Sequence, residues 1–468
     1  MNPTLHKSIP SKNRREIRLL LLCAGRSLDR ETAEQIKSLS TEDIDWHYLV
    51  KMASLHKLQF LVYRSLNIAC PEAVNHPTLK QLGTHYKRNV AYSLRMTRQL
   101  FEIIDLLDDH GIQAMPFKGP VLSELAYGDL TLRPIGDLDL LVDRQNAFKS
   151  IDLFIDQGFR TEIDLDHKQF RAYAAKKNSM AMVNPDSDLT LDLHWAMTGK
   201  WSYEPVVLDR MNKDLFPVTL AGRTVLQPRL ETLLVYLISH STQECWKDME
   251  AVSSIAGLIA GHDHWDWTRV DRMADRMRCK RMVLLGLVLA RDLFDTELPA
   301  TILKAVADNP VVINLAADVC KYLFETSEPE MVENRKSKFS TFQFRARDRW
   351  SEKLRYSRYL LLNATVQDWN RFPLPARLSF LHTFLRPLRL SMTFFSRAMG
   401  GKGQGQMELG MRNAECGKLK QKSVVRGQMS EDRRQRAEDR SQRLEDRRQR
   451  AEDRRQRAED RSQRSEGR

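Results

Sequence analysis

Apolar residues recur at three- and four-residue intervals in two long stretches of the chain. This spacing places apolar side chains on one face of an α-helix. The sequence therefore predicts a helical N-terminal part at residues 13–110 and a helical C-terminal part at residues 226–399. The windows that show the pattern best are residues 45–55, 94–104, 230–240, 251–260 and 281–294.

Between these parts the pattern changes to short apolar runs separated by Gly, Pro and Asp. Runs of about five residues bounded in this way are typical of strands, whereas residues 147–157 keep a helical period. We expect an α/β unit over residues 111–200, within a core of residues 111–225. The predicted fold class is α+β, a small mixed sheet flanked by the two helical parts. The predicted strands are residues 112–117, 138–142, 159–163, 179–183 and 189–195.

The C-terminal end differs in composition from the rest of the chain. Residues 400–405 alternate Gly with Lys and Gln, which favours a flexible linker over residues 400–429. From residue 430 to residue 468 the unit Arg-Arg-Gln-Arg-Ala-Glu-Asp recurs. A coiled coil needs two apolar positions in each heptad, and here only one weakly apolar position is present. We predict a charged low-complexity tail, either a solvated helix or a disordered segment, with no catalytic role.

The formal net charge of +13 favours a polyanionic partner such as a nucleotide, nucleic acid or an anionic membrane surface. Basic residues dominate residues 335–426, away from the acidic motif described next. A solvated basic face explains this excess more simply than nucleic-acid binding, which we keep as the less favoured alternative. No apolar run approaches the ~18 residues of a membrane-spanning helix, so we expect a cytoplasmic protein.

Three aspartates on two predicted strands form the candidate catalytic site. Asp137 and Asp139 are two residues apart, so on a strand their carboxylates share one face while Leu138 and Leu140 point into a core. Neighbouring carboxylates repel unless a cation such as Mg²⁺ neutralises them. An Asp-x-Asp pair alone is common by chance. Asp192, in the centre of the run 189–195, supplies a third carboxylate that is costly to bury without a partner.

Lys118, Gly119 and Arg133 are the candidate phosphate-binding residues. Lys118 and Gly119 follow a predicted strand and precede Pro120 at the start of a predicted helix, where a helix N-terminus and a lysine both favour an anion. Arg133 can bond two phosphate oxygens with its planar guanidinium group. The alternatives are an ordinary strand-to-helix turn with a surface lysine, and a surface arginine or one paired with Asp129. His194 shares a face with Asp192 and is interpreted as a residue that orients it.

Residues 117–142, followed by Leu191-Asp-Leu-His-Trp195, resemble the uncharacterised bacterial nucleotidyltransferase family of the polymerase-beta-like superfamily. The likeness extends more weakly over residues 40–390 and includes His240 and Trp246. It implies two Mg²⁺ ions bound by Asp137, Asp139 and Asp192, and a nucleoside triphosphate as substrate, with ATP favoured as the commonest donor. Lys118-Gly119 stands where the superfamily has a Gly-Ser phosphate loop, which is a departure from its pattern.

The expected reaction is transfer of a nucleoside monophosphate to a hydroxyl acceptor that the sequence does not identify. In it Asp192 receives the acceptor proton, and Lys118 and Arg133 stabilise the phosphates. Two alternatives stay open: a non-catalytic adaptor that binds nucleotide or nucleic acid on the same fold, and a phosphotransferase that moves the γ-phosphate. The sequence leaves the oligomeric state open.

Overall fold

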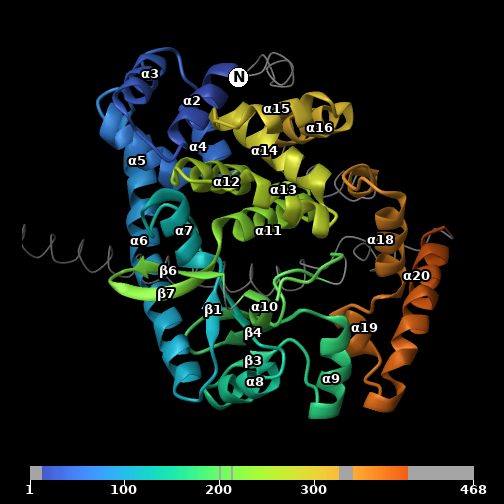
Figure 1. Cartoon of the computed structure of the whole chain (residues 1–468). Coiled ribbons are helices and arrows are strands. Elements are labelled where there is room, and N and C mark those ends of the chain that lie inside the picture. Colours follow the sequence, from blue (N-terminus) through green and yellow to red (C-terminus); the bar gives the residue numbers. More distant parts are fainter. Residues whose placement is uncertain (1–12, 200–201, 212–213, 326–340, 399–468) are drawn as a thin grey trace, which may run out of the picture. The chain divides into compact units, whose positions relative to one another are not determined.

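The chain is an α+β protein in which a small mixed sheet is flanked by helices, as predicted (Figure 1). The computed structural model describes residues 13–199, 202–211, 214–325 and 341–398. The predicted linker 400–429 and repeat tail 430–468 lie outside the described residues. The boundaries predicted for the three globular parts stay predictions.

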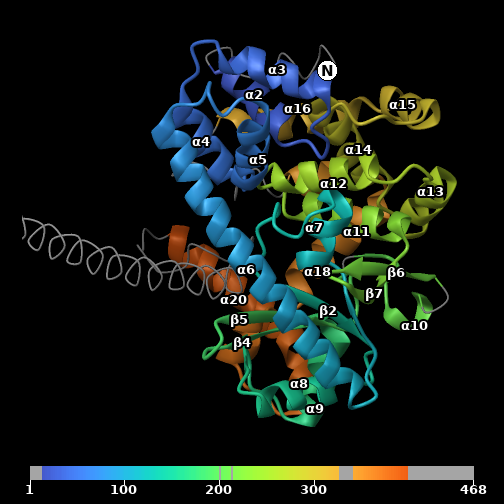
Figure 2. The same cartoon turned by 90° about the vertical axis from the view of Figure 1, so that its left-hand side faces the viewer.

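The first helices after residue 13 pack on one another and lead into the sheet. α6 is 33 residues long and is capped by Asn75, whose side chain accepts a hydrogen bond from the backbone N–H of Thr78. α6 leaves the other N-terminal helices and runs beside the sheet, where it contacts β1 and α7 (Figure 2). The bounds are α2 Arg14–Cys23, α3 Arg30–Ser40, α4 Trp46–Leu55, α5 Gln59–Ala69 and α6 His76–Asp108.

Five strands form the main sheet in the order β1-β2-β5-β4-β3. β2 and β5 are parallel neighbours at its centre, and the other three pairings are antiparallel. All five residues of β2 are buried, as expected for a strand covered on both faces. The bounds are β1 Ala114–Pro116, β2 Leu138–Val142, β3 Arg160–Thr161, β4 Ser179–Asn184 and β5 Leu189–His194.

A hairpin that the apolar pattern did not predict follows the sheet. Its two strands join at Ala221 and Gly222, which both have positive φ, as a tight two-residue hairpin turn requires. Gln227 in the second strand donates a hydrogen bond to the carbonyl oxygen of Pro116, so the hairpin is attached to β1. The bounds here are α7 Gly119–Tyr127, α8 Ala147–Asp156, α9 His167–Lys176, α10 Leu208–Met211, β6 Leu215–Leu220 and β7 Arg223–Pro228.

The helices after residue 228 pack on the start of the chain and on the sheet region. α12 lies against α7, and α14 contacts α2. No helix in the described ranges is both long and apolar enough to cross a membrane. The bounds are α11 Leu230–Gln243, α12 Glu250–Ala260, α13 Trp267–Arg276, α14 Lys280–Phe294, α15 Ala300–Ala307, α16 Pro310–Glu325, α18 Trp350–Leu362, α19 Val366–Arg371, η1 Ala376–Leu381 and α20 His382–Ala398.

Candidate active site

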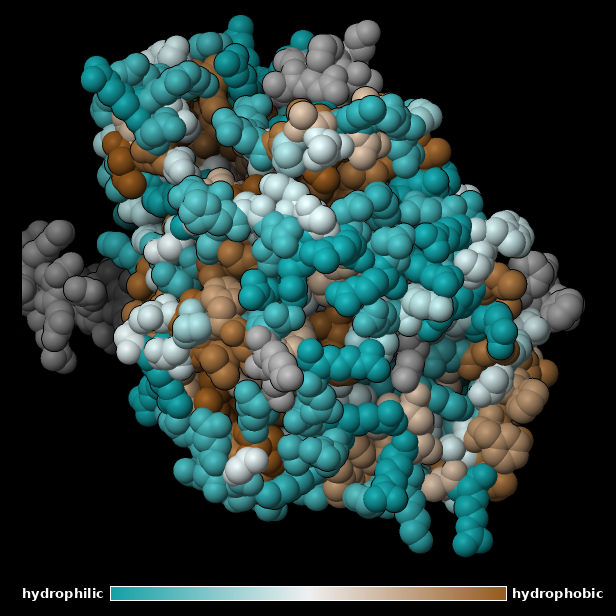
Figure 3. Space-filling model, viewed as in Figure 1, coloured by the Kyte–Doolittle hydropathy of each residue, from teal (hydrophilic) through white to brown (hydrophobic). Residues whose placement is uncertain are grey.

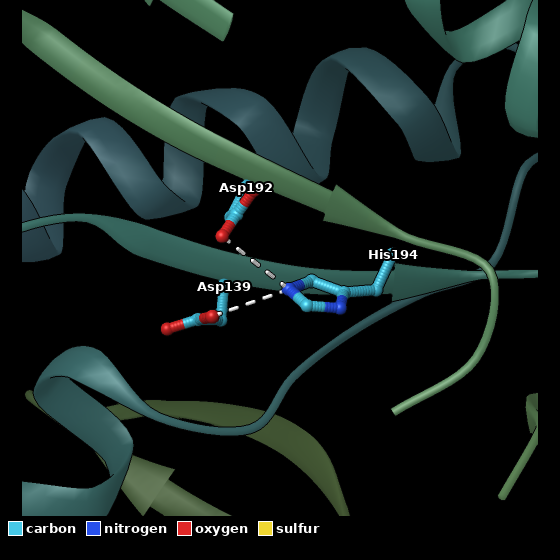
Figure 4. Close-up of side chains that lie close together, drawn as sticks. All are labelled: Asp139, Asp192 and His194. Carbon is cyan, nitrogen blue, oxygen red and sulfur yellow. Dashed lines mark ion pairs between the residues drawn. The ribbon is translucent and has the colours of Figure 1, made fainter. Parts of the chain in front are cut away.

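Asp139 and Asp192 lie side by side at the centre of the sheet. The parallel pairing of β2 with β5 sets Asp139 opposite Asp192, so both carboxylates leave the same face. His194, two residues after Asp192, shares that face. Its Nε2 lies 3.3 Å from Asp139 Oδ1 and 3.8 Å from Asp192 Oδ2. Figure 4 shows the three side chains converging from neighbouring strands.

These three residues fit a divalent cation. One ligand atom from each of Asp139, Asp192 and His194 lies within 4.8 Å of the others, the only such grouping among the residues that the structure describes. Both ring nitrogens of His194 are buried; Nδ1 makes no hydrogen bond to any described residue, and Nε2 approaches the two carboxylates without forming a hydrogen bond to them. A buried polar atom left in this way is costly unless it meets a ligand. Carboxylate oxygens suit Mg²⁺, and the imidazole also suits Mn²⁺ or Zn²⁺.

Lys118 brings a buried positive charge to the same carboxylates. It lies between β1 and α7, and its Nζ is 3.6 Å from Asp139 Oδ1. The Nζ also lies 5.8 Å from the ring centre of Phe117 and 5.4 Å from that of Tyr236. Burial alone would lower the pKa of Lys118, but Asp139, Tyr236 and Asp137 outweigh it and raise the pKa. The side chain is therefore an ammonium ion at neutral pH.

Tyr236 and His240, four residues apart on α11, complete the surroundings of Lys118. His240 Nε2 is 3.4 Å from Lys118 Nζ, and its ring stacks on that of Tyr236. Burial and the cations Lys118 and Lys247 hold the pKa of His240 well below its ordinary value. The imidazole is therefore neutral, and its Nε2 can accept a hydrogen bond from the ammonium group. The sequence reasoning missed Tyr236 as a site residue, although its four-residue spacing from His240 placed both on one helix face.

Gly119 sits at the turn that carries Lys118 over the start of β2. Its φ of +54° favours glycine, and a Cβ there would lie 3.5 Å from the carbonyl oxygen of Asp137. The turn is held by the backbone N–H of Phe117, which donates to the Asp139 carbonyl oxygen at 3.3 Å. Lys118 makes no side-chain cap at the N-terminus of α7. The first amides of α7 therefore have no side-chain cap, and the N-terminus of a helix suits an anion.

Asp137 and Arg133 lie in the segment that leads into β2. Asp137 is half-buried and directly precedes the strand; it raises the pKa of Lys118 by its charge but is not part of the Asp139, Asp192 and His194 group. Arg133 is mostly buried, and its Nε is 2.6 Å from Oε1 of Glu250 on α12. Part of its guanidinium group is thus engaged by a helix far along the chain.

Glu162 is a further carboxyl group near the site. It directly follows β3, and its backbone N–H donates to the carbonyl oxygen of Ala181, the residue that pairs with Asp192. Burial, together with the charge of Asp192, raises the pKa of Glu162 to about 7. Its position at the end of the predicted strand 159–163 was the available signal, but its nearness to Asp192 depends on strand order.

A large cavity of the described residues lies elsewhere. It measures about 1920 Å³ and is lined by α2, α3, α12 and the segment between α14 and α15, including Arg18, Glu42 and Trp265. None of Lys118, Asp139 and Asp192 lines it. The candidate active site is therefore defined by its carboxylates, imidazole and ammonium group and does not coincide with this cavity.

Three solved nucleotidyltransferase-related structures show a distant likeness to the chain. The lincosamide antibiotic adenylyltransferase LnuA with bound lincomycin is 19% identical, covering 30% of this chain and 83% of its own, with a TM-score of 0.23. The antibiotic-resistance factor ANT(2'')-Ia is 15% identical, covering 40% and 94%, with a TM-score of 0.29. An antigenic nucleotidyltransferase-like protein from Paracoccidioides brasiliensis is 14% identical, covering 47% and 96%, with a TM-score of 0.27. Because the TM-scores are this low, these structures do not establish the family or the function of the chain.

The family is shown by the sequence itself. No curated protein matches the chain. A family described as uncharacterised nucleotidyltransferase matches residues 42–295, more than half of the chain. The match includes Lys118, the three aspartates and the α11 residues around Lys118. The chain therefore belongs to this nucleotidyltransferase family, in agreement with the resemblance inferred from residues 117–142 and 191–195.

Proposed function

We propose that the chain transfers a nucleoside monophosphate from a nucleoside triphosphate, with ATP as the first candidate, to an acceptor hydroxyl group. The observation that carries this proposal is the pairing of Asp139 with Asp192 across two parallel strands, with the Lys118 ammonium group 3.6 Å from Asp139. Carboxylates of this kind bind hard cations, and a buried ammonium group beside them binds phosphate oxygens.

Each residue has a distinct part in the proposed reaction. Asp137, Asp139 and Asp192 would hold two Mg²⁺ ions, which when bound polarise the triphosphate and lower the pKa of the acceptor hydroxyl. Asp192 receives the acceptor proton. Lys118 and the amides of α7 stabilise the phosphate oxygens, Gly119 lets those oxygens approach the backbone, and Arg133 supplies a second positive charge.

His194 gives the site a nitrogen ligand beside the carboxylates. Imidazole is accepted by Mn²⁺ more readily than by Mg²⁺. We therefore expect Mn²⁺ to support the reaction as well, and replacement of His194 by Asn to weaken Mn²⁺ binding more than Mg²⁺ binding. Isothermal titration of each ion into the metal-free protein measures this difference. Equal losses for the two ions would assign His194 to positioning Asp192.

Labelled ATP tests the reaction. The purified full chain is incubated with Mg²⁺ or Mn²⁺ and with ATP labelled in the α- or the γ-phosphate, in the presence of sugars, lipid-linked sugars, proteins or RNA as acceptors. Transfer of the α-label with release of pyrophosphate is expected. Transfer of the γ-label instead would identify a phosphotransferase, and a lack of metal-dependent nucleotide binding in calorimetry would identify an adaptor.

Paired substitutions connect the reaction to the site. Asp139→Asn keeps the size of the side chain but removes its charge, and we expect it to lower α-label transfer at least about 100-fold. Asp186→Asn is the matched control, because Asp186 is exposed on the turn between β4 and β5. Wild-type activity in the Asp139 variant would refute the proposed site.

A further inference from the structure

The last described helix, α20, exposes an apolar face and buries a polar one. Phe380 in η1 and Phe384, Leu388 and Met392 in α20 follow one another at four-residue intervals, so they form one stripe along the helix. We call these four residues the α20 stripe. Their exposed fractions are 55%, 67%, 53% and 61%. A helix that packs on a protein normally turns its apolar residues inward, whereas these four apolar side chains are exposed to solvent.

The opposite face of α20 is polar and buried. Arg386 and Arg389 are 4% and 5% exposed, and both pair with the fully buried Asp368 of α19, at 3.0 and 2.6 Å. His382 is also fully buried and stacks on Trp369. These contacts fix the rotation of α20 about its axis. The outward direction of the stripe is therefore built into the fold.

Exposed hydrophobic residues gather in this part of the protein. Of the fifteen large hydrophobic side chains exposed in the described ranges, nine lie between Trp350 and Met392. Trp350 and Leu354, four residues apart on α18, are 78% and 55% exposed, and α18 packs against α20. Brown and tan atoms gather at the right-hand edge of Figure 3, where α20 runs. An apolar surface of this kind marks an interaction site.

Basic residues outnumber acidic ones in the part of the chain that carries the stripe. Residues 341–398 contain eleven Lys and Arg but three Asp and Glu. Four of the eleven are paired with carboxylates: Arg386 and Arg389 with the buried Asp368, Arg345 with Asp318 and Arg349 with Asp275. The three carboxylates within residues 341–398 are all paired with arginines: Asp348 with Arg281, Glu352 with Arg278, and Asp368 with Arg386 and Arg389. Arg371 and Arg377, next to the stripe in the sequence, are exposed. Exposed arginines beside an exposed apolar stripe fit a partner that is both apolar and anionic.

We infer that the α20 stripe and its flanking arginines dock on an anionic lipid bilayer. The aliphatic and aromatic side chains enter the boundary between headgroups and acyl chains, and the arginines contact acidic headgroups. A second copy of the chain fits less well, because a symmetric contact brings like charges together. Nucleic acid matches the arginines but gives Leu388 and Met392 no apolar partner.

Vesicle sedimentation with the full chain tests the inference. Vesicles of phosphatidylcholine with about 30% phosphatidylglycerol are compared with phosphatidylcholine alone. The wild-type chain should bind the anionic vesicles, and less tightly as salt rises. The double substitution Phe384→Ser and Leu388→Ser should lower the partition coefficient at least about tenfold, since each buried apolar side chain contributes strongly to binding. The C-terminal tail is unchanged in all variants, so its charge does not alter the comparison.

Controls separate the stripe from general effects. Ile68→Ser and Leu94→Ser remove two apolar side chains of similar exposure, 63% and 52%, from α5 and α6, and should leave vesicle binding within about twofold of wild type. Arg371→Glu and Arg377→Glu should weaken binding to anionic vesicles and reduce its salt dependence. This second pair also tests the inference if the serine variant does not fold.

Three outcomes would overturn the inference. The first is a wild-type chain that binds neither type of vesicle, and the second is a stripe variant that binds anionic vesicles as tightly as wild type. The third is a wild-type dimer in sedimentation velocity that the Phe384→Ser and Leu388→Ser pair dissociates, which would make the stripe a contact between two copies.

Discussion

Replacing Lys118 by Met should change metal binding and catalysis in opposite directions. Methionine keeps an unbranched side chain of similar length but removes the ammonium group that lies 3.6 Å from Asp139 Oδ1. At that distance, with an effective dielectric constant of about 20, the attraction between the two charges is roughly 4 to 5 kcal/mol. In the metal-free protein this attraction competes with a cation for Asp139.

Only part of that energy appears in the metal affinity, because water and neighbouring groups screen Asp139 once Lys118 is gone. We expect the Lys118→Met protein to bind Mn²⁺ or Mg²⁺ at least about tenfold more tightly, which corresponds to about 1.4 kcal/mol. Nucleotidyl transfer should fall by about 100- to 1000-fold, as when one preorganised group that stabilises transition-state charge is removed.

Two measurements on one preparation test this pair of effects. Isothermal titration of the metal-free protein gives the ion affinity, and release of pyrophosphate from ATP gives the turnover. Lys57→Met is the matched control, because the Lys57 ammonium group pairs with Asp248 at 2.9 Å and not with Asp139. A misfolded variant would lose both properties. Unchanged turnover with unchanged ion affinity in the Lys118 variant would refute the role assigned to this residue.

Three further predictions concern stability. The pKa of Glu162 is raised from 4.5 to about 7 in the folded protein, so the free energy of unfolding falls as pH rises between these values and stays lower above them. Glu162→Gln should remove this loss. In denaturant titrations it should stabilise the metal-free protein by at most about 3 kcal/mol at pH 8 and should not stabilise it at pH 4. Gly257→Ala should destabilise by about 1 to 3 kcal/mol in the same assay, because the added Cβ would lie 2.5 Å from the Ala126 carbonyl oxygen; an unchanged midpoint would show that α12 can move away from α7. Asp368→Ala should cost about 3 to 5 kcal/mol, because two buried arginines lose their partner, and equal thermal stability of variant and wild type would contradict that pairing.

The short apolar runs bounded by Gly, Pro and Asp were enough to predict the strands of the main sheet. The run 138–142 coincides with β2, and the run 189–195 exceeds β5 by one residue. The β6–β7 hairpin was not predicted, because Pro217 interrupts its first strand and Ala221 precedes the glycine in a turn that usually has Asn or Asp there. Strand periodicity is a local signal, and the order of strands in a sheet is not.

For the candidate site, too, the sequence predicted individual residues but not the contacts between them. Local pattern identified Asp139 and Asp192 as separate strand residues, whereas their pairing depends on the parallel register of β2 with β5. The contact of Arg133 with Glu250 joins residues 117 positions apart, and that of Lys118 with His240 joins residues 122 positions apart. Contacts at such separation are formed by helix packing, which a motif of ten residues does not predict.

The matched family region extends well beyond the sheet and includes both of these long-range contacts. A chain cut after residue 225 would keep all three aspartates and Lys118, yet it would lose Tyr236 and His240 from α11 and Glu250 from α12. Lys118 would then meet water where it now meets a neutral imidazole and an aromatic ring, and Arg133 would lose the carboxylate that holds it. The fixed positive charge beside Asp139 thus depends on the C-terminal helices. The family match over residues 42–295 covers the sheet together with these helices.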